Sequence, residues 1–109
     1  MKDHGQPNME ATLRTLKHVH GMARSSRSGE LLTWSGDLDA DTLCAVAAVT
    51  ESALAEVGEM LAAGRLERWY YVSERATYYA SERSLGRLVA IGDSVKNPET
   101  ASKTLHACK

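Results

Sequence analysis

The side chains best suited to chemistry are few in this 109-residue chain, and they are scattered along it. Of the four histidines, at positions 4, 18, 20 and 106, only His18 and His20 are close in sequence. Two nearby histidines can begin a metal site. Here, however, one residue ends a predicted helix and the other lies near a predicted strand, so their side chains should point apart. We therefore expect solvated or helix-capping histidines and predict no metal site.

The acidic and nucleophilic residues also do not occur in any sequence motif that is typical of a catalytic site. Asp39 and Asp41 precede a long apolar segment, where carboxylates interact favourably with the free amides of a helix N-terminus. Serine, histidine and aspartate all occur, but no GxSxG motif frames a nucleophile. The chain has neither a GxxxxGK(S/T) loop nor a GxGxxG loop to hold phosphates, so it is not itself a GTPase. We expect a protein without catalytic activity and without a cofactor.

Composition narrows the classes of partner. With 14 acidic residues and 13 lysines and arginines, the net charge is −1, so no overall field attracts nucleic acid or an anionic membrane. No stretch approaches the roughly 18 apolar residues of a membrane span, and the first seven residues lack the apolar core of a signal peptide. Cys44 and Cys108 have no CxxC spacing and are typical of free thiols in a reducing compartment. We expect a cytoplasmic protein with no nucleic-acid or membrane partner.

The sequence predicts helices separated by groups of two and three strands, and these elements must position any functional site. We interpret residues 1–7 as a flexible tail and residues 8–109 as one domain. Asn8 can cap a first helix that runs to about His18, and Gly21 falls where that helix must end. The remaining predicted elements are strands over 22–27 and 30–35, a helix from Asp39 or Asp41 to Gly64, strands over 66–72, 75–81 and 87–92, and a helix from Pro98. This order, α-β-β-α-β-β-β-α, predicts an α+β domain with one five-stranded antiparallel sheet between helices.

The long helix has two dissimilar sides and no lysine or arginine. One stripe of mostly large apolar side chains predicts the face that packs on the sheet: Leu43, Val46, Thr50, Leu54, Val57 and Leu61. The opposite stripe consists mostly of small side chains: Cys44, Ala48, Ser52, Ala55, Glu59 and Ala62. Small side chains let another backbone approach closely. This second stripe is therefore either a second packing surface or an alanine-rich exposed face.

The strand that follows the long helix is rich in aromatic residues. Side chains alternate across a strand, so we expect either Trp69 with Tyr71 or Tyr70 with Val72 in the core, and the other pair facing a partner. Alternatively, helices of the same chain cover both pairs.

Five arginines gather in this half of the chain: Arg65, Arg68, Arg75, Arg83 and Arg87. These arginines either complement the acidic helix across a dimer, form a basic docking patch, or are scattered and solvated.

This pattern resembles the Roadblock / dynein light chain superfamily over residues 9–108. The resembling pieces are Gly21 after the first helix, the Ser28-Gly29 hairpin, Trp34-Ser35-Gly36-Asp37-Leu38, the alanine-rich helix, and Leu88-Val89-Ala90-Ile91-Gly92 before the last helix. The chain looks most similar to short, free-standing bacterial members. The resemblance implies a profilin-like three-layer sandwich with helix pairs on opposite sides of the sheet.

The resemblance also implies a function. Roadblock proteins homodimerise by pairing their long second helices and by extending the sheet through the third strand, here residues 39–63 and 66–73. We predict a homodimer whose interface includes Ala48, Ser52, Ala55, Glu59, Trp69 and Tyr71. The implied role is a non-catalytic regulatory or scaffolding module, with a small Ras-like GTPase as the candidate partner. The alternative is a cytoplasmic small-molecule sensor, since sensor folds share this sandwich; a sensor requires an apolar pocket.

Overall fold

The computed structural model of the chain describes residues 13–108. Its elements are β1 (Val19–Ser26), β2 (Leu31–Gly36), α2 (Ala40–Met60), β3 (Arg68–Val72), β4 (Thr77–Arg83), β5 (Gly86–Gly92) and α3 (Glu99–Ala107). A first helix precedes β1, and its described part is residues 13–15. The predicted α-β-β-α-β-β-β-α order is confirmed. The predicted tail over residues 1–7 and the predicted cap at Asn8 lie outside the described residues.

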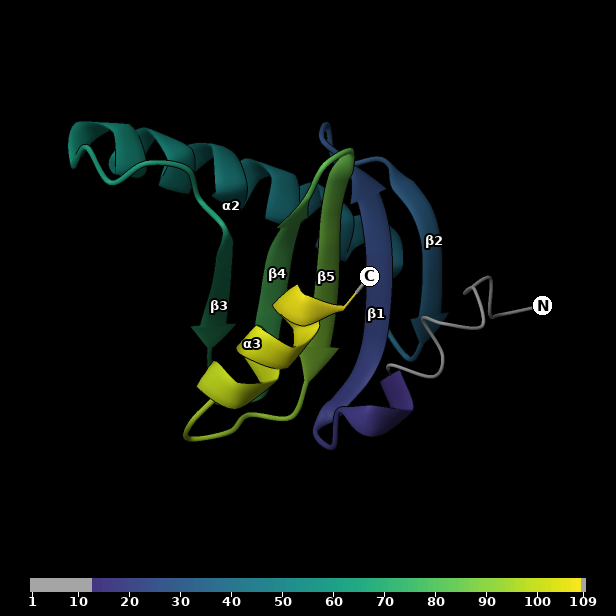
Figure 1. Cartoon of the computed structure of the whole chain (residues 1–109). Helices are drawn as coiled ribbons and strands as arrows, with labels where there is room; N and C mark the ends of the chain where they lie inside the picture. Colours follow the sequence, from purple (N-terminus) through teal and green to yellow (C-terminus); the bar gives the residue numbers. More distant parts are fainter. Residues whose placement is uncertain (1–12, 109) are drawn as a thin grey trace.

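The five strands form one antiparallel sheet in the order β2-β1-β5-β4-β3, so β2 and β3 are its edges. Helices lie on both faces of this sheet (Figure 1). The first helix and α3 share one face, and α2 lies on the other. The three-layer α+β sandwich is therefore confirmed. The expectation of a helix pair on each side is wrong, because within residues 13–108 α2 covers its face without a second helix.

Each face of the sheet has its own apolar cluster. The cluster on the α3 face contains mostly large side chains: Leu16, Val19, Met22, Tyr79, Leu88, Ala90 and Leu105. The buried members of the cluster beneath α2 have small side chains: Ala23, Ala40, Cys44, Ala47, Ala80 and Val89; larger, partly buried side chains pack at its margin. Small side chains on both elements let α2 lie close to the sheet. The side of α2 that packs on the sheet is therefore the one around Cys44. The expectation that the large apolar stripe forms the core is wrong for Val46, Val57 and Leu61, which are exposed, whereas Leu43 packs against this cluster.

Local hydrogen bonds set both ends of α2. The Asp39 carboxylate caps the start by accepting a hydrogen bond from the Thr42 amide at 3.4 Å. At the other end, the Ala62 amide donates to the Glu59 carbonyl and the Ala63 amide to the Gly58 carbonyl. Together with a φ of +53° at Ala62, these two bonds form a Schellman motif. The helix ends earlier than Gly64, because Ala62 takes the left-handed position that glycine usually occupies.

The first hairpin departs from simple alternation. Gly21 lies inside β1 and does not end the first helix; a side chain there would press on the Asp37 carbonyl. The β1–β2 register shifts near Leu32, which is one extra residue in β2. As a result Leu31 and Trp34 both pack beneath α2, whereas Leu32 is exposed. Among the described helices, none is long and apolar enough to cross a membrane.

Candidate interaction surface

The side of α2 that faces away from the sheet carries an uncovered row of apolar side chains. We call Val46, Val49, Val57 and Met60 the α2 apolar stripe; their exposed fractions are 53%, 73%, 48% and 83%. Their spacing of three, eight and three residues places them on one side of the helix. Burying one such side chain is worth about 1.5–3 kcal/mol. A continuous exposed row of this kind is typical of an interaction site.

A groove of about 700 Å³ lies beside the stripe, between α2 and the strands β3 and β4. Its main lining residues are Leu43, Val46, Thr50 and Leu54 from α2 and Trp69, Tyr71, Tyr78 and Ile91 from the sheet. Tyr71 and Tyr78 are cross-strand neighbours whose ring centroids are 6.2 Å apart. Tyr71 is largely exposed. The groove is therefore an aromatic and aliphatic surface that continues from the stripe onto the edge strand.

The groove stays open because α2 packs on only part of the sheet. The buried residues of the helix are Ala40, Cys44 and Ala47, all in its first half. The main contacts of α2 are with β1, β2 and β5. Its second half projects beyond the sheet on the side of β3 (Figure 1). Neither aromatic pair of β3 is fully covered: Trp69 packs against the cluster beneath α2, while Tyr70, Tyr71 and Val72 are exposed.

Arg87 on β5 holds α2 in this position. Its side chain is 2% exposed, and its Nε and Nη2 atoms donate to the two Glu51 oxygens at 2.9 and 2.7 Å. The same guanidinium donates to the carbonyl of Ser26, at the end of β1, and to that of Arg27, in the β1–β2 turn. These hydrogen bonds to Glu51 raise the pKa of Arg87. Arg87 therefore belongs to the interior and not to a docking patch.

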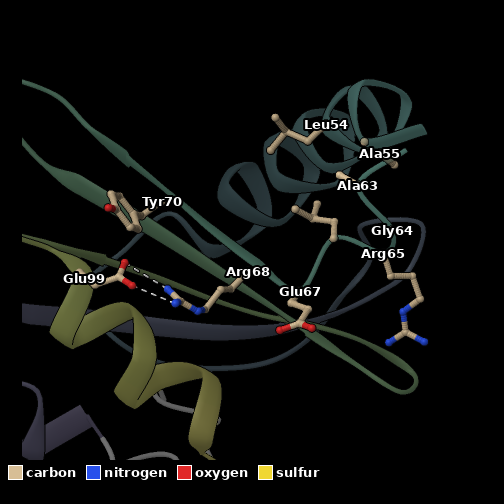
Figure 2. A pocket seen from close by; sticks show the side chains of 11 residues that line it. Leu54, Ala55, Ala63, Gly64, Arg65, Glu67, Arg68, Tyr70 and Glu99 are labelled. Atoms are coloured by element: carbon tan, nitrogen blue, oxygen red, sulfur yellow. Dashed lines mark hydrogen bonds and ion pairs between the residues drawn. The ribbon is translucent and has the colours of Figure 1, made fainter. Parts of the chain in front are cut away.

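A second cleft, of about 480 Å³, lies between the end of α2 and β3, next to α3 (Figure 2). In it Arg68 donates from Nη2 to the Glu99 carboxylate at 3.0 Å and from Nη1 to the Ser102 hydroxyl at 2.8 Å. The hydrogen bond from Arg68 lowers the pKa of Glu99. These bonds tie the edge strand to α3. Of the five clustered arginines, Arg65 and Arg75 are exposed.

A serine–histidine contact on the α3 face fastens that helix to β4. The Ser81 hydroxyl and His106 Nδ1 are 2.6 Å apart, and Arg83 Nη1 donates to the same hydroxyl at 2.6 Å. Arg83 also donates to the carbonyls of Leu105 and Cys108 at the end of α3. A nucleophile must reach its substrate, whereas Ser81 is buried and already engaged. The arrangement is that of a helix anchor.

The six residues predicted for a dimer interface are divided by the fold. Four of them are exposed: Ser52, Ala55, Glu59 and Tyr71. Ala48 is half-buried next to Gly29 of the β1–β2 turn, and Trp69 is packed into the monomer. Their role in a dimer stays a prediction. The sequence did not predict the α2 apolar stripe as an interface. Its only signal is the helical spacing of apolar residues, and on that basis Val46 and Val57 were predicted to face the core.

The three described histidines and the two cysteines form no common site. His18 Nδ1 lies 3.7 Å from the Asp93 carboxylate, while His20 Nδ1 lies 3.2 Å from the Asp37 carbonyl oxygen. In residues 13–108, no three potential metal ligands gather. Both cysteines are free thiols, as predicted. Cys44 is fully buried, and this burial raises the pKa of its thiol.

No protein-family model and no curated protein matches the sequence. Solved structures do match. A Roadblock/LC7 domain from Streptomyces avermitilis has a TM-score of 0.79 at 15% identity, covering 90% of this chain and 85% of that one. Gliding protein MglB from Thermus thermophilus has a TM-score of 0.72 at 22% identity, covering 91% and 83%. A structure of MglB with a tetrameric arrangement has a TM-score of 0.72 at 21% identity, covering 91% and 82%. The chain therefore has the Roadblock/LC7 fold.

Proposed function

We propose that this protein is a homodimer that acts as a non-catalytic regulatory or scaffolding module. The observation that carries the proposal is the α2 apolar stripe, which continues through the groove to the uncovered edge strand β3. A second copy presents the same stripe and the same edge. One two-fold contact can therefore cover both surfaces in both copies at once.

The stripe suits antiparallel pairing of two α2 helices. Its four members are symmetric about the middle of the stripe, near Ala53. Two helices that cross there bring Val46 and Val49 of one copy next to Val57 and Met60 of the other. Such contact removes eight apolar side chains from water, four from each copy, and each contributes favourably to association.

The edge strand supports the same arrangement. A free edge presents unpaired backbone amides and carbonyls, which natural proteins cover or pair. Pairing of β3 with its copy satisfies these groups and extends the sheet across the dimer. The hydrogen bonds from Arg68 to α3 hold β3 in place for such pairing. The MglB structure with a tetrameric arrangement has this fold and supports self-association of such chains.

A small Ras-like GTPase is the proposed partner of the dimer. The support is the resemblance to Roadblock proteins, whose bacterial members bind or regulate such GTPases. The chain itself has no phosphate-binding loop, so the nucleotide would be held by the partner. The test adds the purified protein to a Ras-like GTPase from the same genome and measures complex formation and the rate of GTP hydrolysis. A protein that neither binds any such GTPase nor changes hydrolysis contradicts this part of the proposal.

Sedimentation equilibrium over a concentration series tests the homodimer. We expect a mass of twice the 11.9 kDa of one chain at micromolar concentration. A monomer throughout the series would refute the homodimer without affecting the fold. The same samples should show a two-state monomer–dimer equilibrium from which the dissociation constant is obtained.

The volume and apolar lining of the groove favour one alternative, a small-molecule sensor. Its volume of about 700 Å³ falls within the range of about 300–1,000 Å³ of ligand pockets. The hydroxyls of Thr42, Thr50 and Tyr71 supply polar groups at its lining. Native mass spectrometry separates the two functions. A small molecule retained by the monomer supports a sensor, whereas a ligand-free dimer supports the scaffold.

A further inference from the structure

Glu82 on β4 is a buried acidic residue beside the Arg87–Glu51 ion pair. It lies directly opposite Arg87 in the β4–β5 register, and its side chain is 17% exposed. Its Oε2 atom is completely buried, and no described residue donates a hydrogen bond to it. A negative charge on such an oxygen is strongly unfavourable. Glu82 therefore needs either another donor or a proton.

The neighbouring guanidinium has no donor left for this oxygen. The five N–H groups of an arginine are its full donor capacity. Those of Arg87 donate to Glu51, Ser25, Ser26 and Arg27, with two bonds going to Glu51. Arg87 thus neutralises one carboxylate, that of Glu51. A second ionised carboxylate beside it would have only the mostly exposed Arg27 as a further counter-charge.

The other charged and titratable groups around Glu82 do not satisfy the buried oxygen. Arg27 is mostly exposed in the β1–β2 turn, and its Nη1 lies 3.8 Å from the other oxygen, Oε1. The Cys44 thiol interacts with Ser25 and Arg87. The remaining neighbour is the Glu51 carboxylate, which is held by the same Arg87 guanidinium that lies opposite Glu82 in the sheet and which contributes to the raised pKa of Glu82. Two carboxyl groups can bond to each other only when one of them carries a proton.

We propose that Glu82 and Glu51 share one proton and that this proton fastens the middle of α2 to the sheet. When the proton is present, the Glu82 hydroxyl donates to the Glu51 carboxylate, which also accepts from Arg87. When the proton leaves to solvent, two carboxylates compete for the buried Arg87 guanidinium and repel each other, and the mostly exposed Arg27 compensates only in part. The helix is then held less firmly over β4 and β5. The pair makes the attachment of α2 sensitive to pH near neutrality.

The electrostatics of the two residues agree with this assignment. Burial raises the pKa of Glu82 to about 7, and the hydrogen bond and charge of Glu51 add to the effect. Burial also opposes ionisation of Glu51, but hydrogen bonds from Arg87 and Glu82 outweigh it and lower the pKa of Glu51. At neutral pH Glu51 is therefore ionised, and Glu82 is the group that gains or loses the proton.

The shifted pKa values define the pH window of the effect. The pKa of Glu82 is about 7 in the folded chain, against an ordinary value of 4.5. The resulting stability is complete below about pH 4.5, declines as pH rises, and is lost above about pH 7. Within this window one proton is released on unfolding, so the unfolding equilibrium constant rises by up to about tenfold per pH unit. The lowered pKa of Glu51 acts in the opposite direction, and only below about pH 4.5.

Chemical denaturation of the full chain between pH 5 and 7.5 tests the proposal, at one protein concentration throughout. We expect the wild-type unfolding constant to rise by on the order of 100-fold over this range. The variant Glu82→Gln keeps a donor toward Glu51 but cannot titrate, so its unfolding constant should stay nearly constant. Glu99→Gln is the matched control, because that carboxyl group is also paired with an arginine, Arg68, but on a different element, α3; it should keep the wild-type slope. A wild-type constant that does not rise, or a Glu82→Gln variant that keeps the wild-type slope, overturns the proposal.

Two measurements on the wild-type protein test the shared proton even if the Glu82→Gln variant does not fold. Carbon NMR of the Glu82 carboxyl should give a midpoint near pH 7; a midpoint near 4.5 overturns the shared proton. Amide hydrogen exchange, corrected for its intrinsic pH dependence, should show faster opening of α2 relative to α3 above pH 7. Equal changes in the two helices overturn the assignment of the effect to α2. A monomer contains all the residues involved, so these results do not depend on the proposed dimer.

Discussion

An arginine placed on the α2 apolar stripe should dissociate the proposed homodimer and leave the fold intact. Val49 is the test position, because its side chain is 73% exposed in the single chain. Val49→Arg therefore removes little buried surface from the monomer. We expect its free energy of unfolding to change by no more than about 0.5 kcal/mol, as at other exposed sites. Any large effect must then arise from the contact between copies.

The expected magnitude follows from the exposed fraction and the symmetry. Full burial of a valine contributes about 1.5 kcal/mol, so burying the remaining three quarters of Val49 contributes about 1 kcal/mol per copy. A two-fold interface contains the substitution twice, which makes the loss about 2 kcal/mol. Desolvating two guanidinium groups adds at least about 2 kcal/mol. The sum of about 4 kcal/mol corresponds to a roughly thousandfold weaker dissociation constant.

Sedimentation equilibrium measures this change, and two further arginine substitutions serve as comparisons. Leu85→Arg alters a highly exposed apolar side chain in the β4–β5 turn and should leave the dissociation constant unchanged. Ala55→Arg tests the small-residue side of α2 that the sequence predicts for the interface. A dimer that survives Val49→Arg with unchanged affinity, while circular dichroism confirms the fold, would refute the stripe as the contact. Dissociation by Ala55→Arg alone would move the interface to the small-residue side.

Three predictions concern stability and are measured by thermal or chemical unfolding. Ala62→Gly should raise the free energy of unfolding by about 1 kcal/mol, because Ala62 has a φ of +53°; an unchanged or lower value would contradict the helix end described above. Arg87→Lys should lower it by about 3 kcal/mol, because a lysine cannot reproduce the paired bonds to Glu51 and the turn carbonyls. Gly86→Ala should lower the free energy of unfolding by about 3 kcal/mol, because the added carbon overlaps the Ser25 carbonyl oxygen. The control is Gly58→Ala on α2, where the added carbon meets only the carbonyl of Gly64 and should not be destabilising.

The order of elements was predictable because its signals are local. The hairpin at Ser28-Gly29 depends on one residue that tolerates positive φ, and Gly29 has a φ of +94°. Asp39 begins α2 because its carboxylate can accept a bond from an amide three residues later. The strand at 68–72 is mostly aromatic, and the strand at 86–92 carries the β-branched Val89 and Ile91 between two glycines. Each of these signals acts over a few residues, so it is visible without the fold.

The surface of α2 was not predictable in the same way. Helical periodicity shows which residues share a side, and large apolar side chains usually face the core. Here the fully buried residues of the sheet beneath α2 are Ala23, Ala80 and Val89, which leave room for a close-lying helix backbone, while the larger Trp34 and Trp69 pack at the margin of this cluster. The small side around Cys44 fits this surface. The apolar stripe is therefore turned outward, where it becomes the strongest candidate for an interface.

The sequence by itself determined the number, type and order of the elements, the two sides of the long helix and the aromatic character of β3, because these follow from short-range chemistry. Only the tertiary structure decided which side of α2 meets the sheet, which arginines are interior, and that Glu82 lies beside the Arg87–Glu51 pair. Residues 36 positions apart form that pair. The packing of a whole sheet brings such residues together, and no local pattern specifies it.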